Sequence, residues 1–394
     1  MTNNTAPYIK NALDLIAKKT LEDDLRLGTA FPYVTLPDGS WDTMSVSISA
    51  GYIGENWSHG NWFCGFWVGL LLVSYLHTKD KKYLKLASDR MILVEERAGD
   101  ENTHDIGFIF LSSAMPFYRI TGDKRHRETA LRAADKLRSR LVVTKRGSYV
   151  SSWGPMTDPR GRAASAIDTM ANIPLLYWAA NEADDASFRL AAEEHAKMTM
   201  LSFNRDDDTQ FHAVEYDTKT GERLRGYTFQ GAHDNSYWSR GTGWAVMGLA
   251  VTAANSGNAD YLDQAVKISE KWFEKLGDKP VPPYDYDASG NTIPEDTAAS
   301  AIMAAGLLDL ADLHPNEKIS NLWRKKAEWL IEGLSQFYLA EEDSHRGILK
   351  HGCYSAPHNI GPDAAVMFGD YFFAEALCRI AFPGEFISKY EKLA

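Results

Sequence analysis

Residues 241–254 read GTGWAVMGLAVTAA, and residues 298–311 read AASAIMAAGLLDLA. Each stretch is long enough for a helix and is apolar on nearly every side. A helix of that kind must be enclosed by protein. Glycine inside a helix costs helix propensity, and this cost is understandable where small side chains let helices crowd together. The two stretches therefore predict helices that pack closely in the interior of the molecule.

Helices of this apolar kind alternate along the chain with helices that carry many charges. Residues 65–76 and 164–179 are apolar, whereas residues 81–97 and 125–141 are amphipathic and highly charged. An amphipathic helix covers an apolar interior with one face and exposes the other face to water. The 3.6-residue periodicity predicts about a dozen helices and almost no strands. The expected helices span residues 7–20, 61–78, 81–97, 104–120, 124–142, 164–182, 186–203, 238–256, 259–276, 296–313, 317–338 and 363–381.

The connections between these helices alternate in length as well. Short turns follow the apolar helices, and most of the loops that precede them are long, at residues 21–60, 143–163, 204–237, 277–295 and 339–362. We therefore expect an all-α fold, an (α/α)6 toroid of six helical hairpins with parallel inner helices and an amphipathic outer layer. Such a ring is a single domain, here residues 1–394. An open α-solenoid is the alternative, but the chain has no repeat of fixed period.

Parallel inner helices would place all their N-termini at one rim of the ring. The long loops would lie at the same rim, and long loops in a compact domain commonly build a site. Helix N-termini also favour bound anions. Residues 210–230 alternate apolar and polar side chains around a DTKTGE turn, which predicts a small β-hairpin at this rim.

The composition excludes several classes of function. The chain has 394 residues with 42 Lys and Arg against 53 Asp and Glu, a net charge of −11, so we expect neither a nucleic-acid partner nor binding to an anionic membrane. No apolar run approaches the roughly 20 residues of a membrane span, and no secretory leader is visible, so we expect a cytoplasmic protein. Three cysteines without a CxxC pair, and the histidines at 345, 351 and 358, fit no metal motif. Nucleotide-binding motifs are missing too, so no cofactor is expected.

Asp168 is the most informative candidate for chemistry. It lies among apolar and small residues in the expected helix 164–182, where a carboxyl group loses its hydration and its pKa rises. Such a group has a catalytic role or is a buried aspartate satisfied by the backbone or by Asn172. His104 and Asp105 form a second candidate pair at the start of the expected helix 104–120. The alternative is that Asn102, Thr103 or Asp105 only caps that helix.

A third group of candidates lies between Gln230 and Trp244, in QGAHDNSYWSRGTGW. Arg240 stands among aromatic residues at the start of an inner helix, and arginine recognises carboxylates while keeping its charge when partly buried. A salt bridge to Asp234 is the alternative. Apolar faces of sugars stack on indoles, and Trp62, Trp153 and Trp244 are expected at the rim. Trp67 and Trp178 are expected in the core instead.

The stretches NWFCGFWVG, HDIGF, IDTMANIPLLYWA, WSRGTGW and FGDYFFAEAL, between residues 61 and 377, resemble the unsaturated glucuronyl hydrolases of glycoside hydrolase family 88. The resemblance implies an (α/α)6 barrel. It also implies removal of the 4,5-unsaturated uronic acid that polysaccharide lyases leave at the non-reducing end of oligosaccharides, without metal or cofactor. The substrate is then an unsaturated uronyl oligosaccharide.

The family's two aspartates match Asp105 and Asp168. The resemblance implies hydration of the C4=C5 double bond, with Asp168 donating a proton to C4 and then accepting one from the water that adds at C5. A pKa near neutrality suits both roles. Asp105 would hold sugar hydroxyls and influence Asp168 electrostatically. The resemblance further implies a wall of indoles around the sugar and several polar contacts, assigned to Trp62, Trp153, Trp244, His104, His212, Gln230 and Arg240.

One local departure from the family affects the expected specificity. Phe63 and Cys64 stand where family members usually carry more polar residues, so the subsite for the second sugar differs. The related unsaturated rhamnogalacturonyl hydrolases of family 105 are an alternative with the same ring and chemistry. A sugar epimerase or isomerase that uses histidines, and a scaffold without a site, are alternatives from other classes.

Overall fold

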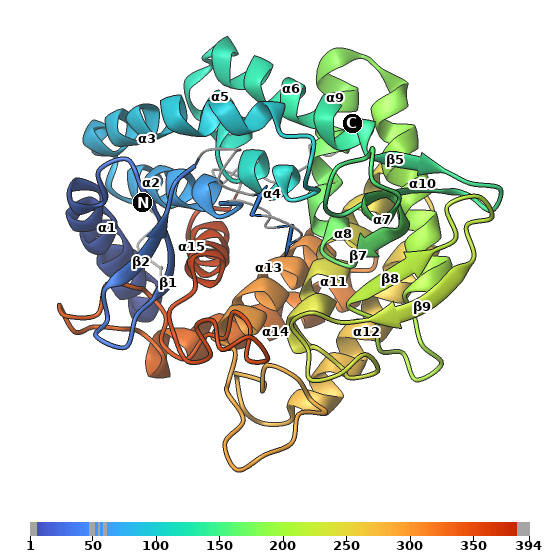
Figure 1. The fold of residues 1–394 in the computed structure, drawn as a ribbon. Helices are drawn as coiled ribbons and strands as arrows, with labels where there is room; N and C mark the ends of the chain where they lie inside the picture. The colour runs from blue at the N-terminus through green and yellow to red at the C-terminus, as the bar shows by residue number, and fades with distance from the viewer. Residues whose placement is uncertain (1–5, 47–51, 54–55, 58–60, 384–394) are drawn as a thin grey trace.

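The structure is a computed structural model that describes residues 6–46, 52–53, 56–57 and 61–383. Most of these residues are helical (Figure 1). None of the described helices is long and apolar enough to cross a membrane. The helices are α1 (Pro7–Leu27), α2 (Cys64–Thr78), α3 (Lys81–Val94), η2 (Glu95–Gly99), α4 (Ile106–Leu111), α5 (Ala114–Thr121), α6 (Lys124–Ser139), α7 (Pro159–Ala163), α8 (Thr169–Asn172), α9 (Pro174–Ala183), α10 (Ala186–Ser202), α11 (Ser239–Ser256), α12 (Asp260–Leu276), α13 (Thr297–Leu313), α14 (Glu317–Phe337) and α15 (Met367–Ala381).

The helices form a closed double ring, so the expected (α/α)6 toroid is confirmed. In the inner layer α2 contacts α4, α4 contacts α8, and the contacts continue through α11, α13 and α15 back to α2. The outer layer consists of α3, α6, α10, α12 and α14, each packed on the inner helix that precedes it. The sixth outer helix is α1, which packs on α2, α14 and α15 and so covers the seam between the two ends of the fold (Figure 1).

Glycines set the spacing of the inner helices. At each of the six contacts around the inner ring, one glycine lies so close to the neighbouring helix that a Cβ there would come within 3.0 Å of it. At Gly248 of α11, for example, the Cβ would lie 2.1 Å from the carbonyl oxygen of Met170 in α8. This close approach confirms the crowding that the small residues predict. The six glycines are Gly65, Gly69, Gly107, Gly243, Gly248 and Gly369.

Two expected inner helices are not continuous. The helix expected at 104–120 is broken between α4 and α5, where Pro116 lacks the N–H that would bond the Ser112 carbonyl. The helix expected at 164–182 begins as strand β7 (Ala164–Ala166) and then breaks between α8 and α9 at Pro174. The prediction that Asp168 lies inside a helix is therefore wrong, because Asp168 follows the strand and directly precedes α8.

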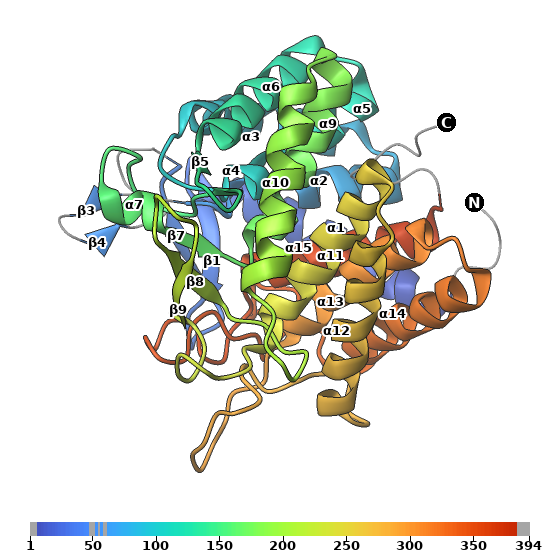
Figure 2. The same ribbon diagram turned by 90° about the vertical axis from the view of Figure 1, so that its right-hand side faces the viewer.

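The expectation of almost no strands is wrong for the loops, because their described residues include nine short strands that pair in four small sheets. The hairpin expected within 210–230 is confirmed by the antiparallel pair β8–β9, and β7 adds a third strand on the other side of β8. Figure 2 shows these strands and α7 together at one end of the ring. The strands are β1 (Phe31–Thr35), β2 (Trp41–Met44), β3 (Tyr52–Ile53), β4 (Asn56–Trp57), β5 (Leu141–Val143), β6 (Ser148–Val150), β7, β8 (Ala213–Tyr216) and β9 (Arg223–Tyr227).

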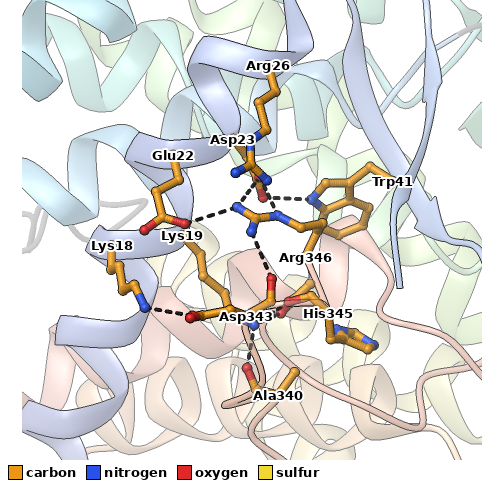
Figure 3. Close-up of polar contacts among 11 residues, drawn as sticks. Lys18, Lys19, Glu22, Asp23, Arg26, Trp41, Ala340, Asp343, His345 and Arg346 are labelled. Carbon is orange, nitrogen blue, oxygen red and sulfur yellow. Dashed lines mark hydrogen bonds and ion pairs between the residues drawn. The ribbon is translucent and has the colours of Figure 1, made fainter. Parts of the chain in front are cut away.

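A polar network ties α1 to the loop between α14 and α15 (Figure 3). The buried Lys19 donates from Nζ to three backbone carbonyls of this loop, at Ala340, His345 (2.6 Å) and Gly347 (2.9 Å). Arg346 of the loop reaches back to Asp23 of α1, with Nε 2.6 Å from Oδ1. The network therefore closes the ring at its seam and holds a loop that continues into the site described next.

Candidate active site

A cavity of about 620 Å³ opens at the rim where the inner helices begin. Five inner helices supply a residue from just before their start or from their first turn: Trp62 for α2, Asp105 for α4, Asp168 for α8, Arg240 for α11 and Phe368 for α15. The parallel arrangement expected for the inner helices thus brings distant segments together. All nine site residues expected from the sequence line this cavity: Trp62, His104, Asp105, Trp153, Asp168, His212, Gln230, Arg240 and Trp244.

The carboxyl group of Asp168 has a strongly raised pKa at this site. The residue is half-buried because part of it faces the cavity, but its Oδ1 atom is shielded from solvent and has no hydrogen-bond partner among the described residues. Burial raises the pKa of Asp168 to about 8, the negative charge of Asp105 adds to the rise, and Arg240 opposes it. The group is therefore poised to release and regain a proton near neutral pH. The side chain of Asn172 does not bond this carboxyl; it donates to the backbone carbonyl of Asp168 at 2.9 Å.

Asp105 is buried directly before α4 and is held by its neighbours. Its Oδ2 accepts a hydrogen bond from Thr103 Oγ1 at 3.1 Å, and its backbone N–H donates to the same hydroxyl at 3.0 Å. Its Oδ1 lies 3.2 Å from His104 Nε2. The side chain of Asp105 does not cap α4. The structure thus places Asp105 beside His104 at the cavity rather than in the capping role considered as the alternative.

The two site histidines differ in their hydrogen bonding. His104 Nδ1 lies 2.6 Å from the Ser152 carbonyl, so this nitrogen carries a hydrogen, and burial lowers the pKa of His104 to about 3. With the hydrogen on Nδ1 and the lowered pKa, Nε2 carries a lone pair, so its contact with Asp105 is not an ion pair. His212 Nδ1 accepts from the Phe229 N–H at 3.4 Å and lies 2.8 Å from Thr228 Oγ1, which leaves Nε2 as the N–H of a neutral ring.

Arg240 is held by four protein acceptors and two aromatic rings. Its Nη1 donates to Asp296 Oδ2 and to the Cys353 carbonyl, both at 2.6 Å. Its Nη2 donates to the Tyr354 carbonyl at 2.8 Å and to Gln230 Oε1 at 3.1 Å. The guanidinium lies between the rings of Trp238 and Phe368, 4.7 Å from each centroid. The acidic partner is Asp296, so the alternative of a salt bridge to Asp234 is wrong. Because its Nη hydrogens are bound by protein acceptors, the guanidinium contributes a positive charge that is fixed in place.

Of the three tryptophans expected to face a sugar, two are slightly exposed to solvent and the third is almost completely buried. Trp62 is 9% exposed and stacks on Phe368 with a centroid distance of 5.3 Å. Trp153 is also 9% exposed and meets Phe229 edge to face at 4.9 Å. Trp244 is only 1% exposed and packs on Phe108 and Phe372, so it belongs to the floor of the cavity. Trp67 and Trp178 are buried in the core, as expected.

The cavity also has walls that sequence reasoning did not assign to it. Phe368 occupies the first turn of α15, so its position at an inner-helix start is a signal that could have found it. The others lie in loops or short elements without a recognisable pattern. His358, considered above only for a metal motif, and Trp238, one of the aromatic residues near Arg240, line the cavity too. The unassigned residues are Arg160, Phe229, Tyr354, Ser355, Ile360 and Phe368.

The described residues contain no group of three or more His, Cys, Asp or Glu side chains that could hold a metal ion. Two histidines of the loop between α14 and α15 have separate partners. His351 Nδ1 lies 2.8 Å from Asp363 Oδ1, and His358 Nδ1 lies 2.8 Å from Ser355 Oγ. The side chains that line the cavity carry carboxyl, imidazole, amide and guanidinium groups.

Comparison with known proteins shows which family the sequence of this chain matches. The model of Glycosyl Hydrolase Family 88 matches residues 40–279, which is more than half of the chain and includes all nine expected site residues. The unsaturated glucuronyl hydrolase of Bacillus sp. (strain GL1) is 32% identical over 326 residues, 81% of this chain and 86% of that protein. An unsaturated chondroitin disaccharide hydrolase of Streptococcus agalactiae serotype III (strain NEM316) is 29% identical, covering 81% of each chain.

The fold matches a solved structure over nearly its whole length. The crystal structure of the unsaturated glucuronyl hydrolase from Bacillus sp. GL1, described as responsible for the degradation of glycosaminoglycan, has a TM-score of 0.89. The sequences are 28% identical, and the match covers 98% of this chain and 100% of that one.

Proposed function

Because the chain belongs to glycoside hydrolase family 88, we propose that it removes 4,5-unsaturated uronic acid from the non-reducing end of lyase-generated oligosaccharides. The observation that carries this proposal is the pair of carboxyl groups in one cavity, where Asp168 has a shielded Oδ1 atom and a raised pKa and Asp105 lines the same space. A vinyl ether needs a proton donor and then a base that accepts a proton from water. A carboxyl group with a pKa near neutrality performs both tasks.

The proposed reaction is a hydration in which protons balance. Asp168 donates its proton to C4, and the positive charge that develops at C5 is shared with the ring oxygen. Water then adds to C5 and gives its proton to the Asp168 carboxylate, which restores the acid. The resulting hemiketal opens at C5, and the hemiacetal left at C1 releases the second sugar. Asp105 binds sugar hydroxyls and, through its charge, keeps Asp168 protonated in the resting enzyme.

Recognition of the uronate carboxylate follows from the charges and donors at the rim. Arg240 supplies a fixed positive charge, although its four Nη hydrogens already have acceptors. Because Gln230 Oε1 accepts from Arg240, the Gln230 NH2 group is the donor that remains for a ligand. His212 Nε2 and His104 supply further polar contacts. Trp62, Trp153 and Trp244 supply the aromatic walls and floor for the sugar ring.

The organisation and setting of the enzyme belong to the same proposal. Among the described residues, one large hydrophobic core extends from Ile9 in α1 to Cys378 in α15, with a small second cluster around Trp153, and this supports the proposal of a single catalytic domain over 1–394. The cytoplasmic location and the absence of a metal or cofactor remain predictions of the sequence.

Purified protein and unsaturated disaccharides from glycosaminoglycan and pectic lyases test this function. The ultraviolet absorbance of the C4=C5 bond should fall with at least one glycosaminoglycan-type disaccharide. Asp168→Asn should abolish the loss, whereas Asp89→Asn, an exposed substitution on α3, should retain wild-type rates. Turnover of pectic disaccharides alone would favour the rhamnogalacturonyl type instead, and no absorbance loss with any of these substrates would contradict the proposal.

A further inference from the structure

Asn172 bridges the two segments that carry the site aspartates. Its side chain is fully buried at the end of α8. Its Oδ1 accepts a hydrogen bond from the backbone N–H of Phe108, in the first turn of α4, at 2.6 Å. Its Nδ2 donates to the backbone carbonyl of Asp168 at 2.9 Å. One amide group therefore joins the start of α4, which follows Asp105, to the residue that precedes α8.

The hydrogen-bond partners fix the orientation of this amide. The partner of Oδ1 is an N–H and the partner of Nδ2 is a carbonyl oxygen, so a flipped amide would oppose donor to donor and acceptor to acceptor. The Phe108 N–H is one of the backbone donors at a helix start that lack a partner within the helix. Asn172 thus caps α4 from a neighbouring helix, in a place where the side chain of Asp105 makes no capping bond.

Close packing at Gly107 leaves Asn172 no room to move toward α4. A Cβ at Gly107 would lie 2.6 Å from Asn172 Cβ, from its carbonyl oxygen and from its Oδ1. At this point the two helices therefore meet closely through Gly107 and Asn172. The separation of the two helix starts depends on this contact.

We propose that Asn172 is a positioning residue that sets the distance and orientation between the carboxyl groups of Asp105 and Asp168. The inference rests on the proposed function of these two aspartates. Asn172 touches neither carboxyl group and acts through the backbone at Phe108 and at Asp168. A displacement of about 1 Å at reacting groups can cost on the order of 100-fold in rate, so a small change in this bridge has a large effect on turnover.

The groups that face Asp168 determine which way its titration moves when the bridge is broken. Asp105 from the start of α4 raises its pKa, and Arg240 from α11 lowers it. His104, His212, His358 and Arg160 line the same cavity. If the start of α4 moves away from α8, the repulsion from Asp105 weakens and the pKa of Asp168 falls. Asp168 then loses its proton at lower pH, and the alkaline limb of the rate profile shifts in the same direction.

Asn172→Leu tests the proposal because leucine has the same number of side-chain heavy atoms and the same branching at Cγ but neither donates nor accepts a hydrogen bond. We expect kcat to fall by roughly 100-fold with a small change in KM, and the alkaline limb of kcat/KM to move to lower pH. Asn255→Leu is the matched control. Asn255 also donates to the carbonyl four residues earlier, Val251 at 2.9 Å, but lies in the last turn of α11 and does not line the cavity. It should retain the wild-type kcat and pH profile.

The measurements distinguish a failure of the positioning role of Asn172 from a failure of the proposed enzymatic function. A wild-type enzyme without activity on unsaturated disaccharides contradicts the function, whereas an active wild type with an unchanged pH profile in Asn172→Leu overturns the positioning role. If Asn172→Leu fails to fold, Asn172→Ala gives the same comparison. Gly107→Ala, which pushes on Asn172 from the other side, should also lower kcat and change the pH profile. A wild-type kcat and profile in Asn172→Ala would overturn the proposal too.

Discussion

Arg240 Nη1 lies 2.6 Å from Asp296 Oδ2, and both side chains are buried beneath the mouth of the cavity. The pair joins the start of α11 to the residue that caps α13, and the same guanidinium holds the backbone at Cys353 and Tyr354. A charge that is fixed in this way stabilises a bound anion without having to reorganise. Removing the two charges from water costs free energy, and their attraction offsets this cost only while both side chains are present.

Removing one member of this pair is therefore predicted to destabilise the fold and the site together. Asp296→Asn leaves the Arg240 charge buried and should lower the free energy of unfolding by about 3–5 kcal/mol. Arg240→Lys should lower kcat/KM strongly, because one ammonium cannot reach four acceptors around a planar group. Asp89→Asn, which removes an exposed pair with Lys85, should cost less than about 1 kcal/mol in the same denaturant titrations. Equal costs for Asp296→Asn and Asp89→Asn would contradict the prediction.

Asp168→Asn should stabilise the protein increasingly as the pH rises. The pKa of Asp168 is about 8 in the folded chain against an ordinary value of 3.8, so between these values the folded state holds a proton that the unfolded state has lost. The stability of the wild type therefore falls with pH across this window, while asparagine is unaffected. Thermal unfolding of both proteins from pH 4 to 9 measures the difference. The gain should be smaller in an Asp105→Asn background, and a gain independent of pH would exclude the raised pKa.

Lys19→Met should destabilise the seam of the ring shown in Figure 3. Lys19 donates to three backbone carbonyls, and each buried carbonyl left without its donor costs about 1–3 kcal/mol. The neighbouring Lys18 pairs only with Asp343 at the surface, with about half of its side chain exposed (51%). Lys18→Met should therefore leave the melting temperature nearly unchanged. Similar melting temperatures for the two variants would argue against a structural role of the buried lysine.

Gly248→Ala should separate two inner helices at the site. The added Cβ would lie 2.1 Å from the Met170 carbonyl, two residues after Asp168, so both stability and kcat should fall. Overpacking of this kind typically costs about 1–3 kcal/mol. Gly99→Ala is the control, since a Cβ at that position would meet no atom within 4 Å beyond its chain neighbours and its own helical turn. The prediction fails if both variants unfold at the same denaturant concentration.

The sequence was a good guide wherever the physical signal was local. Apolar helices rich in glycine alternate with charged ones, and this pattern predicts both the ring and the rim at which its inner helices begin. The residues at those starts, such as Asp105 and Arg240, could be placed in one site because parallel helices share an end. The hairpin around DTKTGE could be predicted from its turn and its alternation.

The features of the fold and the site that could not be predicted depend on contacts between segments distant in sequence, which no local pattern reveals. Asp168 follows a strand because β7 pairs with β8, about fifty residues away in sequence. The acidic partner of Arg240 is Asp296 rather than the nearby Asp234, because α11 and α13 are neighbours in the ring. Tyr354 and Ile360 line the cavity from a loop whose course is set by its tie to α1. Asn172 could be named from the sequence as a neighbour of Asp168, but its hydrogen bond to the Phe108 N–H could not be predicted.

The central claim is that Asp168 protonates C4, so that hydration of the double bond precedes release of the second sugar. The most direct test follows both events in heavy water with a purified unsaturated disaccharide. If Asp168 protonates C4, absorbance of the C4=C5 bond is lost no later than the second sugar appears, one deuterium enters C4 on a single face, and Asp168→Asn stops both events. Release of the second sugar while the double bond is still intact would contradict it.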